Sequence, residues 1–161
     1  ASFVVAATEN AKVLSLWLKD SAGNVSTRVD SNSVVLDTSA PVLASATVTN
    51  PNPTNSPSFG LAYGAMTGTY VEYCIRENST VVGGCTWTAG TLPATFAVSG
   101  DGAKVLSIWL RDAAGNVSTR VDTGSVTLDT SAPTLASATL SNSNPTNTVV
   151  YSLTYGAADA Y

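Results

Sequence analysis

The chain has 161 residues, of which 44% are hydrophobic and only 11% are charged, and its net charge is −4. Its seven Lys and Arg residues are scattered, so no basic patch for nucleic acid exists, and no apolar run of about 18 residues marks a membrane span. The sequence contains no His, no paired carboxylates at a catalytic spacing and no glycine-rich phosphate loop. We therefore expect a protein that is not an enzyme.

A long internal repeat organises the chain. The segment AKVLSLWLKDSAGNVSTRVD from Ala11 returns as AKVLSIWLRDAAGNVSTRVD from Ala103, an offset of 92 positions. DTSAPVLASATVTN from Asp37 returns as DTSAPTLASATLSN from Asp129 at the same offset. This period is longer than those of helical and solenoid repeats, and it matches a β-sandwich module of about 100 residues.

The repeat divides the chain into one complete module and two parts. With the boundary at DTSAP, where Pro enforces extended backbone before it, residues 37–128 form a complete repeat. Residues 1–36 are then the C-terminal part of a preceding repeat, and residues 129–161 are the N-terminal part of a following repeat. Each part contains too few strands to close a sandwich unaided.

Short alternating runs, rich in Val and Thr and separated by turn residues, predict strands throughout. We expect an all-β fold of tandem immunoglobulin-like Greek-key β-sandwich modules, with about seven strands per repeat. In the complete repeat the predicted strands are residues 42–49, 58–63, 69–76, 81–88, 94–98, 103–111 and 116–128. The last is long for a strand, and we predict a bulge or kink within it at residues 122–124.

The sixth predicted strand has two different faces. Leu106, Ile108 and Leu110 share one face, which we expect to point into the core. Trp109 and its repeat counterpart Trp17 fall on the opposite face, where an exposed ring could contact a sugar or a neighbouring fibre. The alternative, which recurrence in both copies favours, is that each Trp covers the outer face of its sheet and packs against an arginine side chain.

The two cysteines, Cys74 and Cys85, lie 11 residues apart with turn residues between them. This spacing suits a disulfide across a hairpin or between neighbouring strands, and a disulfide implies an oxidising compartment. Two free buried thiols are the alternative that this spacing leaves open.

Two motifs recur in order: DSAGNV from Asp20 and DAAGNV from Asp112, followed by DTSAP from Asp37 and from Asp129. They resemble the bacterial immunoglobulin-like tandem repeats of large surface adhesins and biofilm proteins. The resemblance covers the whole chain, and the pair Cys74 and Cys85 departs from the family's generic pattern. It implies an extended rod on the bacterial cell surface, outside the cell, with calcium at the junctions in several members.

Carboxylates gather at the predicted junction between modules. In a sandwich, the linker at Asp37 enters at the same end as the DAAGN turn that contains Asp112, and the preceding repeat contributes Glu9 from its lower loop. Three carboxylates with backbone carbonyls would form a set of hard oxygen ligands for calcium, which takes roughly six to eight of them. We therefore name calcium as a candidate cofactor that stiffens the junction.

An equally weighted alternative needs no metal. Asp112 and Asn116 then close a tight turn through Asx hydrogen bonds, and Asp37 is a solvated linker residue. At the second junction Asp101 and Asp129 occupy the equivalent positions, so the same two interpretations apply there.

Two classes of function follow from these patterns. The first is a structural spacer or stalk of an extracellular bacterial adhesin or fibre, whose partners are neighbouring repeats of the same chain and other copies in a fibre. The second is a glycan- or protein-binding module, which rests on the tryptophans alone. Near-identity of the repeats favours the spacer, because a receptor site usually occurs once whereas spacers are duplicated freely.

The two part-repeats raise a further hypothesis. The C-terminal part of one copy could complete the N-terminal part of another and build head-to-tail filaments, with a gap equivalent to residues 69–92. The alternative is that the array continues on both sides. The rarity of unprotected strand edges favours the continuing array.

Overall fold

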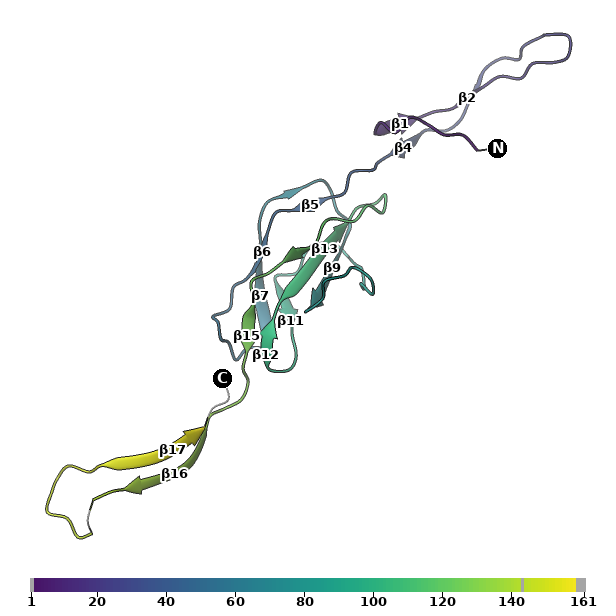
Figure 1. Cartoon of the computed structure of the whole chain (residues 1–161). Coiled ribbons are helices and arrows are strands. Elements are labelled where there is room, and N and C mark those ends of the chain that lie inside the picture. The colour runs from purple at the N-terminus through teal and green to yellow at the C-terminus, as the bar shows by residue number, and fades with distance from the viewer. Residues whose placement is uncertain (1, 143, 159–161) are drawn as a thin grey trace.

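The computed structural model describes residues 2–142 and 144–158, and these residues form strands and loops but no helix. The all-β prediction is thus confirmed. The molecule is elongated: a central module of residues 37–128 carries a hairpin-like extension at each end (Figure 1). Among the described residues, no segment forms a helix that is long and apolar enough to cross a membrane.

The central module has two main antiparallel sheets. One sheet has the order β10 (Thr88–Ala89), β9 (Glu72–Glu77), β13 (Leu106–Arg111) and β14 (Val121–Asp122), and the other has the order β11 (Thr95–Ala97), β7 (Ser58–Tyr63) and β6 (Ala46–Val48). Two short pairs complete the module: β5 (Val42–Leu43) with β8 (Met66–Thr67), and β12 (Gly102–Lys104) with β15 (Val126–Leu128). This arrangement is consistent with a β-sandwich.

Two clusters of buried apolar side chains lie between the sheets. The first contains Phe59, Leu61, Val98, Leu106, Val126 and Leu128, and the second contains Leu43, Ala46, Ile108 and Leu110. The prediction that Leu106, Ile108 and Leu110 face the core is confirmed, because all three are fully buried. Burial of each such side chain stabilises the fold by about 1.5–3 kcal/mol.

The last predicted strand changes partner within its length. Its first part, β14, pairs with β13, whereas its second part, β15, pairs with β12. At the break the Leu106 N–H donates to the Thr123 hydroxyl (3.0 Å), and the Val105 N–H donates to the side-chain oxygen of Asn78 (2.9 Å). The expected bulge in this strand is therefore the point where the chain passes from one strand pair to the next.

The predicted strand at residues 81–88 is wrong for most of its length, because only its last residue belongs to β10. Residues 78–87 form a loop instead, which we call the disulfide loop. Positive φ angles at Asn78 (49°) and Gly84 (80°) interrupt extended backbone at both of these positions. The glycine-rich stretch that suggested a hairpin turn thus belongs to a longer irregular segment.

The two part-repeats form separate hairpins. In the N-terminal flank (residues 2–36), β1 (Asn10–Lys12) pairs with β4 (Val34–Leu36), and β2 (Ser15–Leu16) pairs with β3 (Val29–Asp30). In the C-terminal flank (residues 129–142 and 144–158), β16 (Thr134–Leu140) pairs with β17 (Leu153–Ala158). The buried hydrophobic residues of the described chain all lie between Leu43 and Leu128, so neither flank has a core of its own.

Candidate inter-repeat joints

The Asp112 carboxylate closes a tight turn between β13 and the chain that follows. Its Oδ1 accepts hydrogen bonds from the backbone N–H of Ala114 (2.9 Å) and of Asn116 (2.8 Å). Its Oδ2 accepts a further bond from the Asn116 side chain at 2.9 Å. Asn116 and these backbone donors lower the pKa of Asp112, because they favour its ionised form. This is the Asx turn expected from the residue types.

The same turn lies next to the linker that enters the module. The Asn116 side-chain amide donates to the backbone carbonyl of Asp37 at 3.2 Å, across 79 positions of sequence. The Asp37 carboxylate points elsewhere: its Oδ1 accepts the N–H of Ser39 at 3.1 Å. The linker and the turn thus meet through an amide and a carbonyl.

We define the first joint as Glu9, Thr38 and Ser39. One carboxylate oxygen of Glu9 accepts three hydrogen bonds: from the Thr38 N–H (3.0 Å), the Thr38 hydroxyl (2.9 Å) and the Ser39 hydroxyl (2.6 Å). The bend at residues 7–9, which precedes β1, is thereby attached to the linker that follows the flank. Charged acceptors make stronger hydrogen bonds than neutral ones, so this contact orders the linker.

The second joint consists of Asp101, Thr130 and Ser131, each of them 92 positions after its counterpart. Asp101 Oδ1 accepts from the Thr130 N–H (3.0 Å) and hydroxyl (2.7 Å), and its Oδ2 accepts from the Ser131 hydroxyl (2.8 Å). Asp129 repeats the role of Asp37 by accepting the N–H of Ser131 at 3.0 Å. Both ends of the central module therefore carry the same set of contacts.

Hydrogen bonding lowers the pKa of both joint carboxyls. The Ser39 hydroxyl has the largest effect on the pKa of Glu9, followed by the backbone N–H and hydroxyl of Thr38. The hydroxyls of Thr130 and Ser131 have the corresponding effect on the pKa of Asp101. Both carboxyls are thus held in the ionised form that the joint requires.

The carboxylates predicted to bind calcium have hydrogen-bond partners within the protein. Glu9 and Asp112 already accept hydrogen bonds from protein donors, and Asp37 is bonded to the backbone of Ser39. Within residues 2–142 and 144–158, no group of three or more acidic, His or Cys side chains gathers closely enough to hold a metal ion. The calcium prediction therefore has no assembled ligand set at this joint.

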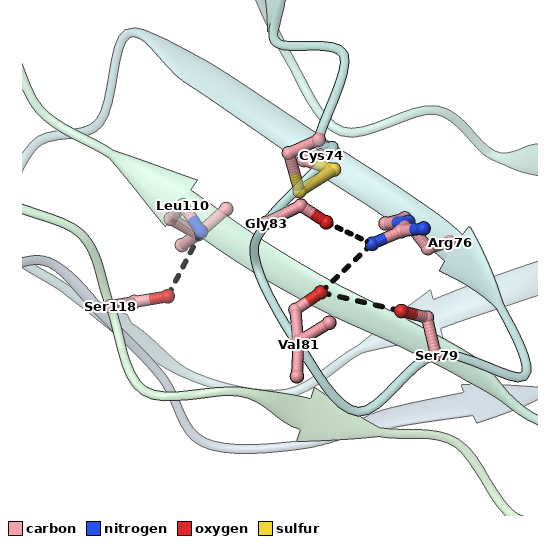
Figure 2. The surroundings of a disulfide bond; sticks show 8 residues. Cys74, Arg76, Ser79, Val81, Gly83, Leu110 and Ser118 are labelled. Carbon is pink, nitrogen blue, oxygen red and sulfur yellow. Dashed lines mark hydrogen bonds between the residues drawn. A yellow bond between two sulfur atoms is a disulfide. The ribbon is translucent and has the colours of Figure 1, made fainter.

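The cysteines form a disulfide, as predicted, with their Cα atoms 5.8 Å apart. The bond attaches the disulfide loop to β9, and Figure 2 shows the loop in front of β13. The Arg76 guanidinium, which belongs to β9, also holds the loop by donating to the carbonyls of Val81 and Gly83. A disulfide indicates a protein that resides outside the reducing cytoplasm.

Trp109 lies opposite Cys74 in the pairing of β13 with β9, so the two side chains share a face of the sheet. Because Cys74 carries the disulfide loop, Trp109 is covered and only 4% exposed. The idea that its ring stands free for a ligand is therefore wrong for the central module. Arg120 also contacts this loop, because its guanidinium donates to the Thr80 carbonyl at 2.8 Å.

Trp17 and its repeat counterpart Trp109 lie in nearly the same local sequence, but their surroundings differ. It is 52% exposed, and in the described chain no loop equivalent to residues 78–87 accompanies the N-terminal flank. The third tryptophan, Trp87, lies under the Arg111 guanidinium, whose central carbon is 4.3 Å from the ring centroid. In the central module, Trp87 and Trp109 therefore serve the packing of the loop against the sheet.

The sequence analysis did not predict the hydroxyl groups that donate hydrogen bonds in the two joints. Thr38 and Ser39, like Thr130 and Ser131, lie inside the DTSAP motif that had marked only a boundary. The repetition of the sequence DTS in both linkers could have indicated these donors, since a solvated linker needs no fixed pair of hydroxyls.

Neither the protein-family models nor the curated proteins compared with the chain match it.

Proposed function

We propose that this chain is a structural spacer: part of a tandem array of immunoglobulin-like modules that forms a stalk. The observation that carries the proposal is the repetition of one joint at both ends of the central module. Glu9 and Asp101 bind the following linker through equivalent donors. A joint that recurs with the repeat gives each module a similar orientation relative to the next, as a rod requires.

The composition supports a location outside the cell, on a surface exposed to oxidation. A disulfide persists in such compartments, and the surface is polar but poor in charge. The DxAGNV and DTSAP motifs support membership of the bacterial surface-adhesin repeats that they resemble. We propose neighbouring repeats as its direct partners and no catalytic role.

A binding function has weaker support in the central module. The most suitable aromatic ring for stacking on a sugar, Trp109, is buried beneath the disulfide loop. The Arg111 guanidinium already stacks over the ring of Trp87. A spacer needs neither tryptophan ring at the surface. The positions of Trp87 and Trp109 therefore support a spacer more than a binding module.

Small-angle X-ray scattering of the dilute, monomeric chain tests the spacer. We expect wild type to keep one narrow distribution of long dimensions, and the double variant Glu9→Ala/Asp101→Ala to give a broader distribution with a shorter mean. Asp20→Ala is the matched control, because it removes a carboxylate that serves a turn away from the joints. If the double variant scatters like wild type, the joints do not order the rod and the proposal fails.

A further inference from the structure

The loop between β6 and β7 contains a motif that belongs to neither joint. It reads NPTN from Asn52, and the same four residues return from Asn144 at the repeat offset of 92 positions. In the central module this loop lies beside β15, the last strand, at the end where the chain leaves the module (Figure 1). Thr54 and Leu128 form a parallel bridge there. The motif therefore connects the first segment of the module to its last strand.

Asn52 binds the last strand through both polar atoms of its side chain. Its Nδ2 donates to the carbonyl of Ser125 at 3.2 Å, and its Oδ1 accepts the N–H of Thr127 at 2.9 Å. In a strand, the carbonyl of one residue and the N–H of the residue two positions later point to the same side. A side-chain amide supplies both a donor and an acceptor, so Asn is suited to bind this pair of backbone groups.

Thr54 continues the pairing with its backbone. Its N–H donates to the Thr127 carbonyl, and its own carbonyl accepts the N–H of Asp129, both at 2.9 Å. Thr54 is only 6% exposed, so water has little access to these bonds. Asn52 and Thr54 thus bind four successive polar groups along one side of residues 125–129. We call this set the clamp: Asn52, Thr54, Ser125, Thr127 and Asp129.

The clamp joins the two segments through which tension enters and leaves the module. The linkers at Asp37 and at Asp129 extend from opposite ends of the central module (Figure 1). The segment from Asp37 to Thr54 runs from the first end to the second, and β15 runs parallel to it toward the second end. Tension on the two linkers therefore pulls this segment and β15 in opposite directions along their length. All four clamp bonds are then loaded together in shear.

Hydrogen bonds that are loaded together resist tension better than bonds that break one after another. A load at the open end of a hairpin acts on one bonded pair, which breaks before the next pair is stressed. In the clamp the load runs along the bonded segments, so the four bonds share it and must break almost at once. The load also passes from Thr54 to Thr127 directly, without crossing the apolar core between the sheets.

We propose that these residues form a mechanical clamp, which lets the module carry tension along the stalk without unfolding. This inference rests on the proposed spacer function for the source of the tension. The resistance itself is a property of the module, and it can be measured on this chain alone. The transition state for unfolding under tension is then a structure in which the clamp has separated while β6 and β7 are still paired.

A matched control lies two residues before the clamp. Asn50 makes the same two kinds of bond as Asn52: its Nδ2 donates to the Ser58 carbonyl (3.2 Å), and its Oδ1 accepts the N–H of Gly60 (2.7 Å). These bonds attach the loop to β7 and do not involve β15. They stay intact while the clamp separates, so their loss should not change the rate of unfolding under tension. Loss of the Asn52 bonds should raise that rate.

Single-molecule force spectroscopy of the full chain, held at its two ends, tests the clamp with Asn52→Ala and Asn50→Ala. The step of the central module is identified by its length, which corresponds to residues 37–128 without the loop that the disulfide closes. At constant force we expect Asn52→Ala to unfold roughly tenfold faster than wild type, since two hydrogen bonds are lost before the barrier. Asn50→Ala should unfold within about twofold of the wild-type rate.

Urea unfolding at equilibrium separates mechanical resistance from ordinary stability. Asn52 is exposed and Asn50 is partly exposed, so Ala leaves no cavity in the core at either position. Each variant loses two hydrogen bonds, and we expect the two variants to have similar midpoints in urea. The difference between them should therefore appear only under tension.

The proposal is overturned if Asn52→Ala unfolds under tension at the wild-type rate, or if Asn50→Ala accelerates unfolding to the same extent. In the second case, unfolding under tension follows the overall stability of the module and not the position of the lost bonds. The scattering test of the joints is independent of both outcomes. A rod with disordered joints can still contain a module that resists tension, and an ordered rod can contain one that does not, so the two proposals can fail separately.

Discussion

The carboxylates of Glu9 and Asp101 accept the same set of hydrogen bonds, from the threonine and serine of the linker that follows each. The hydroxyl of Ser39 lies 2.6 Å from Glu9, and that of Ser131 lies 2.8 Å from Asp101. The two acids differ by one methylene, so the joint tolerates either side-chain length. This equivalence makes the carboxylate itself, and not the shape of one residue, the essential group.

Replacement of Asp101 by Asn should loosen the second joint. The amide has one acceptor oxygen and no charge, so it cannot receive the Thr130 and Ser131 bonds at full strength. We expect the Thr130 amide to exchange its hydrogen several-fold faster in Asp101→Asn, as NMR-detected exchange would show. Asp101→Glu is the matched control and should exchange like wild type, because Glu already fills this role at position 9. Equal protection in Asp101→Asn and wild type would contradict the assignment.

The joints should also respond to acid. The pKa of Glu9 lies below its ordinary 4.5 and that of Asp101 below its ordinary 3.8, because both ionised forms accept hydrogen bonds. A carboxyl whose folded pKa is lowered contributes order above its unfolded pKa and loses it as pH falls through the folded pKa. We expect the Thr38 and Thr130 amide shifts to stay constant from neutral pH down to those ordinary values and to change only below them. A change centred near pH 6 would contradict this.

The sequence predicted the core better than the joints, for a physical reason. Alternation identified Leu106, Ile108 and Leu110 because burial on one face of a strand imposes a period of two. Hydrogen bonds from Thr130 to Asp101 impose no period, since they join a loop to a linker 29 positions later. Only the exact repetition of the linker could have indicated them.

The alternation of residues along β13 also could not predict that the face with Trp109 is buried. Trp109 belongs to the polar side of the alternation, yet the disulfide loop covers it. That loop is irregular because Asn78 and Gly84 adopt positive φ, and the turn residues within it fit a hairpin equally well. The spacing of Cys74 and Cys85 predicted their bond but not the face that the bond would cover.

Calcium provides a direct test of how the joints are held. Because Glu9 and Asp101 accept hydrogen bonds from the linker itself, we expect thermal unfolding and scattering to be unchanged when calcium replaces a chelator. A calcium-dependent rise in the melting temperature that disappears in Asp37→Ala or Asp112→Ala would contradict this expectation. It would establish instead the metal-stiffened junction that the sequence resemblance implies.

Removal of the disulfide should destabilise the central module and uncover Trp109. Its cysteines are 11 positions apart, and a loop of that size stabilises by about 3 kcal/mol in the chain-entropy description. In a Trp17→Phe background, Cys74→Ala/Cys85→Ala should lower the free energy of unfolding by roughly that amount. The emission of the remaining tryptophans should shift to longer wavelength before global unfolding. Unchanged emission would show that the loop stays in place without its covalent bond.

The repeat offers a comparison of one substitution in two environments. Leu110 is fully buried, whereas its counterpart Leu18 is 68% exposed within nearly the same local sequence. Leu110→Ala should cost the central module about 2–5 kcal/mol through lost burial and the cavity left behind. Leu18→Ala should cost the chain close to nothing, since the Leu18 side chain is already exposed to solvent.

Urea unfolding monitored by circular dichroism measures both variants. Equal losses for the two variants in dilute solution would mean that the N-terminal flank folds onto a core of its own. That result would contradict the exposure of Leu18 in the N-terminal flank.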